Sequence, residues 1–284
     1  MIKIISEDST ALLEVYKTSD SPKGAVVICP GGGYSFLSPR EAAPVAERFT
    51  AAGYLAFVLY YEVEKEILGD LPLHQLAKAV AYVRSHAAEY ELTGKKIFVC
   101  GFSAGGHLAA SLGIHWNHKE RFEKDCDLTL HRPDGMILAY PVITSNEKAH
   151  RGSMERLAGS DRKAQEYFSL EKYVDEDTVP TYLWGTASDE TVPVENSLLL
   201  LQELVKYQVP VEYHLFPFGV HGLSTATKDV EEPDKERIED PHVARWVPLC
   251  IHWLDEIAIK ENCKDKVIEN FKKVVSSIFE NVPK

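Results

Sequence analysis

Short apolar runs that alternate with helix-like segments constrain the fold of this 284-residue chain more than any other feature. The runs are "GAVVICP" (24–30), "YLAFVLYY" (54–61), "KIFVCGF" (96–102), "GMILAYPV" (135–142), "PTYLWGT" (180–186) and "PVEYHLFP" (210–217). Helices are expected near residues 39–52, 71–91, 104–115, 193–207 and 241–259, and several of them begin at Pro or Ser and end at Gly. Continuous apolar strands separated by crossover helices predict an α/β fold with a mostly parallel sheet and helices on both faces.

The first residues predict how this sheet ends. "MIKIIS" and "ALLEVYK" have no helix between them, which indicates an antiparallel pair at the sheet edge and brings the expected strands to eight. No internal repeat or low-complexity linker divides the chain, so we expect a single domain over residues 1–284. Right-handed crossovers bring the carboxyl ends of parallel strands to one edge, where α/β proteins carry their sites.

Composition and charge argue against several kinds of partner. With 45% hydrophobic and 26% charged residues, the chain has the composition of a soluble globular protein. A formal net charge of −12 argues against nucleic acid or an anionic membrane as the main partner. No run reaches membrane-spanning length, and the first residues do not have the pattern of a signal peptide, so we expect a cytoplasmic location.

The stretch "VCGFSAGGHLAA" (99–110) places Ser103 between two glycines, directly after an apolar run and before a helix-like run. A GxSxG sequence between strand and helix is typical of a nucleophile elbow. The serine there adopts a strained backbone conformation, so a side chain at Gly101 or Gly105 would clash with the neighbouring strand or helix. The small Ala104 would let its own N–H face a substrate. The alternative, a glycine-rich turn with an incidental serine, is disfavoured by this context.

A nucleophilic serine also needs hydrogen-bond donors for the negative charge that develops on the substrate. In "VICPGGGYSFLSPRE" an apolar strand ends at Cys29, and the three glycines at 31–33 allow backbone N–H groups to approach a ligand closely. A phosphate-binding loop is the weaker alternative, because neither GxxxxGK[ST] nor GxGxxG is present. A loop without such a role is the other alternative.

The acid and the base of a triad should follow the serine in the order Asp, then His. Asp189 lies in "ASDETVPVENS", just after the strand expected at 180–186, and His221 lies in "FGVHGLS", just after the strand expected at 210–217. Both residues therefore have the expected order and lie at the expected edge. Glu190 is the direct competitor of Asp189.

The other histidines do not indicate a metal site. Only His221 among eleven has the required position, whereas His107 is expected to pack or hydrogen-bond locally, and the position of His150 implies no partner. No HExxH or HxxxD spacing is present, and the five cysteines form no CxxC pair. We therefore expect neither a metal nor an organic cofactor.

These motifs resemble the α/β-hydrolase superfamily, and within it the small acetyl-esterase or acetylxylan-esterase-like hydrolases, which are related to the hormone-sensitive-lipase and feruloyl-esterase-like groups. The matching pieces are "PGGGYSFLSPRE", "GFSAGGHLAASLG", "RPDGMILAYPVIT", "HRGS", "LWGTASDETVPVENSLLL" and "FPFGVHGLS", which together cover about residues 24–255. The resemblance implies a serine carboxylesterase that hydrolyses short-chain acyl esters, foremost acetyl esters, including those of acetylated sugars or xylo-oligosaccharides.

The resemblance also assigns roles to individual residues. It implies a triad of Ser103, Asp189 and His221, and an oxyanion hole from the N–H groups of Gly32 or Gly33 and of Ala104. The chain departs from the family at three positions, because many relatives carry histidine at Pro30, arginine at Glu62 and aspartate at Gln75. The arginine and the aspartate form a structural pair in the relatives, so their joint absence indicates a subgroup.

Two alternative functions stay open. One is an amidase or exopeptidase on the same fold, since nothing in the sequence decides between ester and amide. The other is a catalytically inactive binding protein, which the intact serine and histidine loops disfavour. Tyr34, Phe36 and Trp184 lie near the motifs and could line a substrate pocket, although aromatic residues beside strand ends also serve as core.

Two segments fall outside the strand–helix alternation. The mixed, polar insertion at about 143–179 should fold over the strand ends and is a lid candidate by position. At about 262–281, "KDKVIENFKKVVSSIF" has apolar residues at helical spacing, which predicts an extra C-terminal amphipathic helix. Its apolar face must bury against the domain or against a second subunit, which would make a homodimer.

Overall fold

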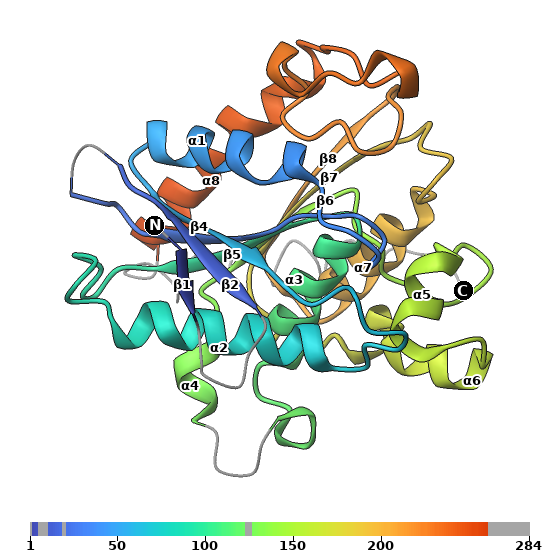
Figure 1. The fold of residues 1–284 in the computed structure, drawn as a ribbon, viewed down its shortest axis with the longest axis horizontal. Coiled ribbons are helices and arrows are strands. Elements are labelled where there is room, and N and C mark those ends of the chain that lie inside the picture. The colour runs from blue at the N-terminus through green and yellow to red at the C-terminus, as the bar shows by residue number, and fades with distance from the viewer. Residues whose placement is uncertain (1, 5–10, 19–20, 123–126, 261–284) are drawn as a thin grey trace, which may run out of the picture.

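The computed structural model describes residues 2–4, 11–18, 21–122 and 127–260. Within them, eight strands form one sheet in the order β1-β2-β4-β3-β5-β6-β7-β8 (Figure 1). The strands are β1 (Ile2–Ile4), β2 (Leu12–Tyr16), β3 (Ala25–Cys29), β4 (Leu55–Tyr60), β5 (Ile97–Phe102), β6 (Met136–Ala139), β7 (Thr181–Thr186) and β8 (Val211–Phe216). The helices are α1 (Ala43–Ala51), α2 (Leu71–Ser85), α3 (Ala104–His115), α4 (Leu128–His131), α5 (Arg151–Ala158), α6 (Arg162–Gln165), α7 (Glu195–Lys206) and α8 (Trp246–Lys260).

The topology confirms the expected mostly parallel sheet. All neighbouring strands from β4 to β8 in this order run parallel, whereas β2 is antiparallel to both β1 and β4. The antiparallel pair expected at the sheet edge is therefore β1 and β2. The carboxyl ends of β3, β5, β7 and β8 all lie at one edge, where the glycine loop, the elbow and the Asp189 and His221 loops begin.

Two helical layers cover the sheet. Helices α1 and α8 lie on one face, and α2, α3 and α7 lie on the other (Figure 1). Ala25, Val27 and Cys29 of β3 pack with the α2 and α3 side, while Val26 and Ile28 between them pack with the α1 and α8 side. Because both faces of such a strand are buried, its sequence is apolar without alternation.

Two of the expected helices, over 71–91 and 39–52, are shorter in the structure. The helix expected over 71–91 ends at Ser85. After it, the chain takes a left-handed residue at Glu91 (φ 56°), and Tyr90 and Leu92 enter the core, with the Tyr90 ring 5.2 Å from that of Phe57. The segment expected as a helix over 39–52 is split into a 3-10 turn (Pro39–Glu41) and α1. Among the described helices, none has the length and apolarity needed to cross a membrane.

The insertion at 143–179 folds into α5, α6 and two 3-10 turns, Glu166–Phe168 and Leu170–Tyr173. Arg156 of α5 donates hydrogen bonds to the carbonyl oxygens of Tyr34 at 3.2 Å and Val63 at 2.6 Å. Both carbonyls belong to loops that follow the carboxyl ends of strands, β3 and β4, so the insertion lies at this edge as expected. Its action as a lid stays a prediction.

The amphipathic segment expected at about 262–281 lies outside the described residues, and so does the subunit interface expected on it. The single-domain organisation over residues 1–284 also stays a prediction.

Candidate active site

Ser103 occupies a strained turn between β5 and α3, as the elbow sequence predicts. Its backbone has φ 54° and ψ −117°, a conformation that L side chains rarely adopt. A Cβ at Gly101 would lie 2.0 Å from the carbonyl oxygen of Gly105, and a Cβ at Gly105 would lie 2.1 Å from that of Cys29. The two glycines are therefore required because helix, elbow and strand β3 meet backbone to backbone.

The structure brings the three residues expected to form a triad into one hydrogen-bonded chain. The Oγ of Ser103 lies 2.8 Å from Nε2 of His221, and Nδ1 of His221 lies 2.6 Å from Oδ2 of Asp189. The Asp189 side chain is 1% exposed and the His221 side chain 11% exposed. An ionised carboxylate can only accept, so Nδ1 donates to Asp189, and in the neutral ring Nε2 is then free to accept the serine proton.

Asp189 is fixed by the loop that carries it. Its Oδ1 accepts hydrogen bonds from the N–H groups of Thr191 and Val192, both at 2.9 Å, which leaves Oδ2 for His221. Glu190, its competitor in the sequence, is exposed. The two backbone donors orient the Asp189 carboxylate toward His221, whereas the neighbouring Glu190 points to solvent.

The glycine loop after β3 faces the serine. Gly32 (φ 133°) and Gly33 (φ 63°) have backbone conformations that favour glycine, and both line the same cavity as Ser103. Within the described residues, the hydrogen bonds of this loop leave their two N–H groups without an acceptor. The N–H of Ala104 is the first of α3 and has no acceptor in its own helix. These three donors are available to a ligand beside Oγ.

Ser103 and His221 line a cavity of about 540 Å³ whose wall combines apolar surface with polar and charged side chains. Besides Ser103 and His221, its wall includes the glycine loop, His150 and Gly152 of the insertion, and the segment after His221. Charged side chains around it are Arg40, Glu41, Glu231, Glu232, Lys235 and Arg237. A space of this size admits a small organic molecule with polar substituents.

Comparison with known proteins shows what this architecture belongs to. Residues 13–204, more than half of the chain, match the BD-FAE family model. The chain belongs to the BD-FAE family. This finding confirms the resemblance to α/β-hydrolase esterases that the motifs indicate.

Solved structures similar to this BD-FAE chain cover nearly all of it. An acetyl ester-xyloside bifunctional hydrolase from Caldicellulosiruptor lactoaceticus is 34% identical, with a TM-score of 0.79 over 90% of this chain and 96% of that one. A carboxylesterase from Lactobacillus plantarum is 27% identical, with a TM-score of 0.75 over 88% of this chain and 95% of that one.

Curated relatives of the BD-FAE chain are longer proteins. Endo-1,4-beta-xylanase B from Butyrivibrio fibrisolvens is 38% identical over 216 residues, which are 74% of this chain and 34% of that protein. An acetylxylan esterase from Xylanibacter ruminicola is 26% identical over 233 residues, which are 78% of this chain and 46% of that protein. The chain thus spans about a third to a half of the length of these relatives.

The aromatic residues considered as substrate contacts divide into two groups. Phe36 is 59% exposed and lines the cavity of this BD-FAE site. Tyr34 and Trp184 do not, because both are buried in the core. The Tyr34 hydroxyl hydrogen-bonds Nδ1 of His107 at 2.9 Å, and the Trp184 ring stacks on Trp246 at 5.1 Å. The structure thus corrects the expectation that these two rings contact substrate directly.

The histidine after the elbow has the local packing role that the sequence predicts. His107 is 1% exposed, and its Nε2 lies 2.9 Å from the carbonyl oxygen of Phe168. Burial lowers the pKa of His107 to about 4, so the ring is neutral at physiological pH. This contact ties α3 to the insertion.

The two departures from the family pattern in the fourth strand region lie in contact. The side-chain oxygen of Gln75 accepts a hydrogen bond from the backbone N–H of Glu62 at 2.8 Å. At the two positions where the resemblance implies an arginine–aspartate pair, this chain has a hydrogen bond from a backbone N–H to a side-chain amide.

The sequence does not single out His150, yet His150 lines the same cavity as Ser103 and His221. It begins α5, and its Nδ1 accepts from the N–H of Ser153 at 3.3 Å and lies 2.8 Å from the Ser153 hydroxyl oxygen. Burial and the nearby His221 lower the pKa of His150, which favours the neutral ring. With Nδ1 occupied as an acceptor, Nε2 carries the proton. The one sequence signal that could have indicated His150 is that it begins "HRGS", one of the motifs that carry the resemblance.

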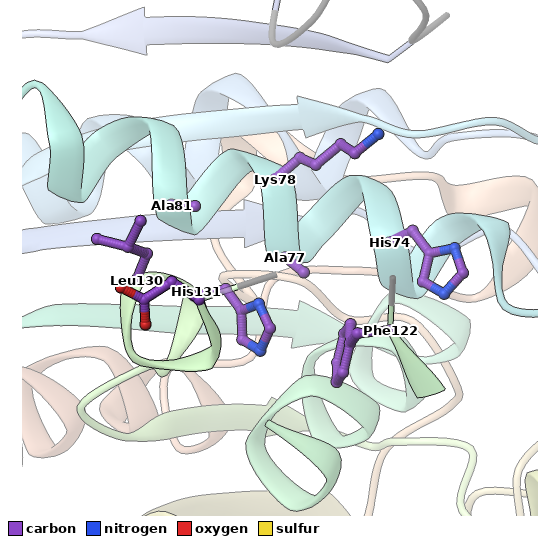
Figure 2. A pocket seen from close by; sticks show the side chains of 8 residues that line it. His74, Ala77, Lys78, Ala81, Phe122, Leu130 and His131 are labelled. Carbon is purple, nitrogen blue, oxygen red and sulfur yellow. The ribbon is translucent and has the colours of Figure 1, made fainter. Parts of the chain in front are cut away.

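A second, smaller cavity of about 130 Å³ lies between α2 and α4 (Figure 2). Figure 2 shows the ring of Phe122 between those of His74 and His131, and these two histidines bind the backbone carbonyls of Arg121 and Trp116. None of its lining residues belongs to the triad or to the first cavity.

Proposed function

We propose that this protein is a serine carboxylesterase that removes short acyl groups, foremost acetyl, from acetylated sugars or xylo-oligosaccharides. The observation that carries the proposal is the hydrogen-bonded chain Ser103–His221–Asp189, with distances of 2.8 and 2.6 Å, beside a cavity that Ser103 and His221 line. Similar proteins named an acetylxylan esterase and an acetyl ester-xyloside hydrolase support the substrate class.

The proposed reaction has two acyl-transfer steps. His221 accepts the Ser103 proton at Nε2 as Oγ attacks the ester carbonyl carbon, and Asp189 stabilises the charge on the ring. The N–H groups of Gly32 or Gly33 and of Ala104 donate to the developing oxyanion. His221 then protonates the leaving alcohol, and a water molecule activated by the same ring hydrolyses the acyl-enzyme.

The charged and polar side chains in the cavity wall support a hydroxyl-rich alcohol as the leaving group. Long acyl chains need a continuous apolar surface, because burying charged and polar groups under hydrocarbon costs free energy. In the wall of this cavity Arg237 and Arg40 form ion pairs with Glu232, at 2.6 and 3.3 Å, and these charges interrupt its apolar surface. Hydroxyl groups of a sugar can hydrogen-bond such a wall.

A substrate profile tests this function. We expect kcat/KM for 4-nitrophenyl esters to fall by about tenfold or more from acetyl to octanoyl, on the order of 1.4 kcal/mol or more in transition-state binding. We also expect acetate release from acetylated xylo-oligosaccharides, unchanged by a chelator. Faster cleavage of aminoacyl anilides than of esters would indicate the amidase alternative, and a maximum at octanoyl would contradict the proposed substrate class.

His150 is the proposed contact to the alcohol part of the substrate. We expect His150→Asn to raise KM for an acetylated xylo-oligosaccharide about three- to tenfold, the effect of one lost neutral hydrogen bond, with little change in kcat. Asparagine is a good helix N-cap, so α5 keeps its first turn while the Nε2–H is lost.

The control for this variant is His252→Asn, a substitution at a side chain 76% exposed on α8. The His252 variant should match the wild type for both substrates. Equal KM values for wild type and His150→Asn on the sugar ester would remove His150 from the binding site.

The cytoplasm is the proposed compartment. Its support is that the cysteines of the described residues, Cys29, Cys100 and Cys250, are buried free thiols, as is usual where thiols are kept reduced. A homodimer through the C-terminal segment stays a prediction.

A further inference from the structure

One buried carboxylate at the site has no part in the proposed proton transfers. Glu41 ends the 3-10 turn Pro39–Glu41, is 3% exposed and belongs to the cavity wall. Its Oε2 accepts the backbone N–H of Gly31 at 2.8 Å, and its Oε1 accepts the hydroxyl of Tyr140 at 2.7 Å. Burying a carboxylate is costly, and here both oxygens are compensated by neutral donors from two different loops.

The first of these contacts fixes the start of the oxyanion loop. A Cβ at Gly31 would lie 2.8 Å from Oε2 of Glu41 and 2.6 Å from the carbonyl oxygen of Phe102, so the carboxylate packs directly on this backbone. The loop then closes on itself, since Ser38 donates to the carbonyl of Gly31 at 2.9 Å. Gly31 is thereby held at both its N–H and its carbonyl oxygen, which sets the direction of the N–H groups that follow it.

The second contact reaches the catalytic histidine. The Tyr140 oxygen also accepts the N–H of Ser224 at 2.9 Å, three residues after His221. The Tyr140 ring packs against the His221 ring, with centroids 5.0 Å apart and planes at 70°. Burial and the Glu41 carboxylate raise the pKa of Tyr140 well above its usual value, so its hydroxyl stays protonated and donates.

We propose that Glu41 is a positioning residue, whose carboxylate ties the oxyanion loop to the His221 loop through Tyr140 so that donors and base face the same carbonyl carbon. The inference rests on the proposed esterase function. It assigns no proton transfer to Glu41. The oxyanion loop and the His221 loop share Glu41 as one hydrogen-bonded anchor.

Glu41→Gln tests this with a minimal change. The amide oxygen can still accept from Gly31, but the amide nitrogen then faces the Tyr140 hydroxyl and cannot accept its proton. We expect kcat for 4-nitrophenyl acetate to fall about tenfold to a hundredfold, the size of a lost hydrogen bond to a charged group, while KM changes less than about threefold. The binding of phenylboronic acid, which forms a tetrahedral adduct with the serine, should weaken in parallel with kcat.

Two further variants define the route of the effect. Tyr140→Phe should lower kcat as well, and the double variant Glu41→Gln/Tyr140→Phe should lose less than the product of the two single effects, because both act through one contact. Glu47→Gln, the same chemical change at an exposed position on α1, should leave kcat, KM and boronic acid binding at wild-type values. Circular dichroism and the thermal midpoint of each variant are measured beside the kinetics.

The outcomes are distinct. Wild-type kcat and boronic acid affinity in folded Glu41→Gln would overturn the inference even if the thermal midpoint falls, since a purely structural residue would give that result. Strictly multiplicative single effects would overturn the route through Tyr140. Ester hydrolysis that survives Ser103→Ala in an otherwise wild-type chain would instead refute the proposed serine esterase function, independently of any Glu41 result.

Discussion

A Ser103→Ala enzyme is expected to lose kcat for acetyl ester hydrolysis by about a millionfold, the typical effect of removing a serine nucleophile. The expectation follows from geometry, because Oγ is the atom that lies 2.8 Å from the base and beside the glycine-loop donors. The side chain of alanine has no proton to transfer and forms no acyl-enzyme. Substrate binding should persist, since the cavity wall is unchanged.

Hydrolysis of 4-nitrophenyl acetate and labelling by a fluorophosphonate measure this loss together. Ser111→Ala is the matched control. Ser111 lies on α3, the helix that follows Ser103, and its hydroxyl donates to the carbonyl of His107 at 2.8 Å. It should label and turn over like the wild type. If folded Ser103→Ala still carries label and still cleaves the ester, the nucleophile lies elsewhere.

Asp189→Asn should lower kcat by about 10⁴-fold, as a triad that holds the wrong histidine tautomer does. Here the direction of the amide is set by the loop. The N–H groups of Thr191 and Val192 bind one oxygen at 2.9 Å, so the asparagine oxygen takes that place and its NH₂ group faces Nδ1. Nδ1 must then accept, Nε2 carries the proton, and the ring cannot take the serine proton.

Glu190→Gln gives the matching control, since Glu190 is the exposed neighbour that competes with Asp189 in the sequence. Single-turnover kinetics should show the Asp189 variant slowed in acylation, with the Glu190 variant unchanged. If Glu190→Gln is slow and Asp189→Asn is not, the catalytic acid is Glu190, which contradicts the hydrogen bond between Asp189 and His221.

The elements that the sequence predicts well are those with a local signature. The strands are visible because residues such as Val26 and Val27 are buried on opposite faces, which makes the run apolar throughout. The elbow and the loops of Asp189 and His221 follow from strand ends and short motifs. Their meeting at one edge follows from the handedness of the crossovers.

The parts that the sequence misses depend on contacts between distant segments. Glu41 and Tyr140 are 99 residues apart, and neither has a local pattern that reveals their hydrogen bond. The role of His150 depends on how the insertion folds over the strand ends. Tyr34 and Trp184 were expected near substrate because they adjoin the motifs, but the direction of a side chain at a strand end is decided by packing, and both rings point into the core.

The close backbone contact at Gly105 has a consequence for redesigning substrate preference. A Cβ there would meet the carbonyl oxygens of Cys29 and Pro30, so at this point the start of α3 and the loop after β3 are held at backbone contact distance. Repacking the cavity wall, for example at Phe36 or Lys235, therefore leaves that spacing intact. A mutant library confined to wall positions such as these two can explore new alcohols and acyl groups, whereas the elbow glycines and Glu41 have to be left unchanged.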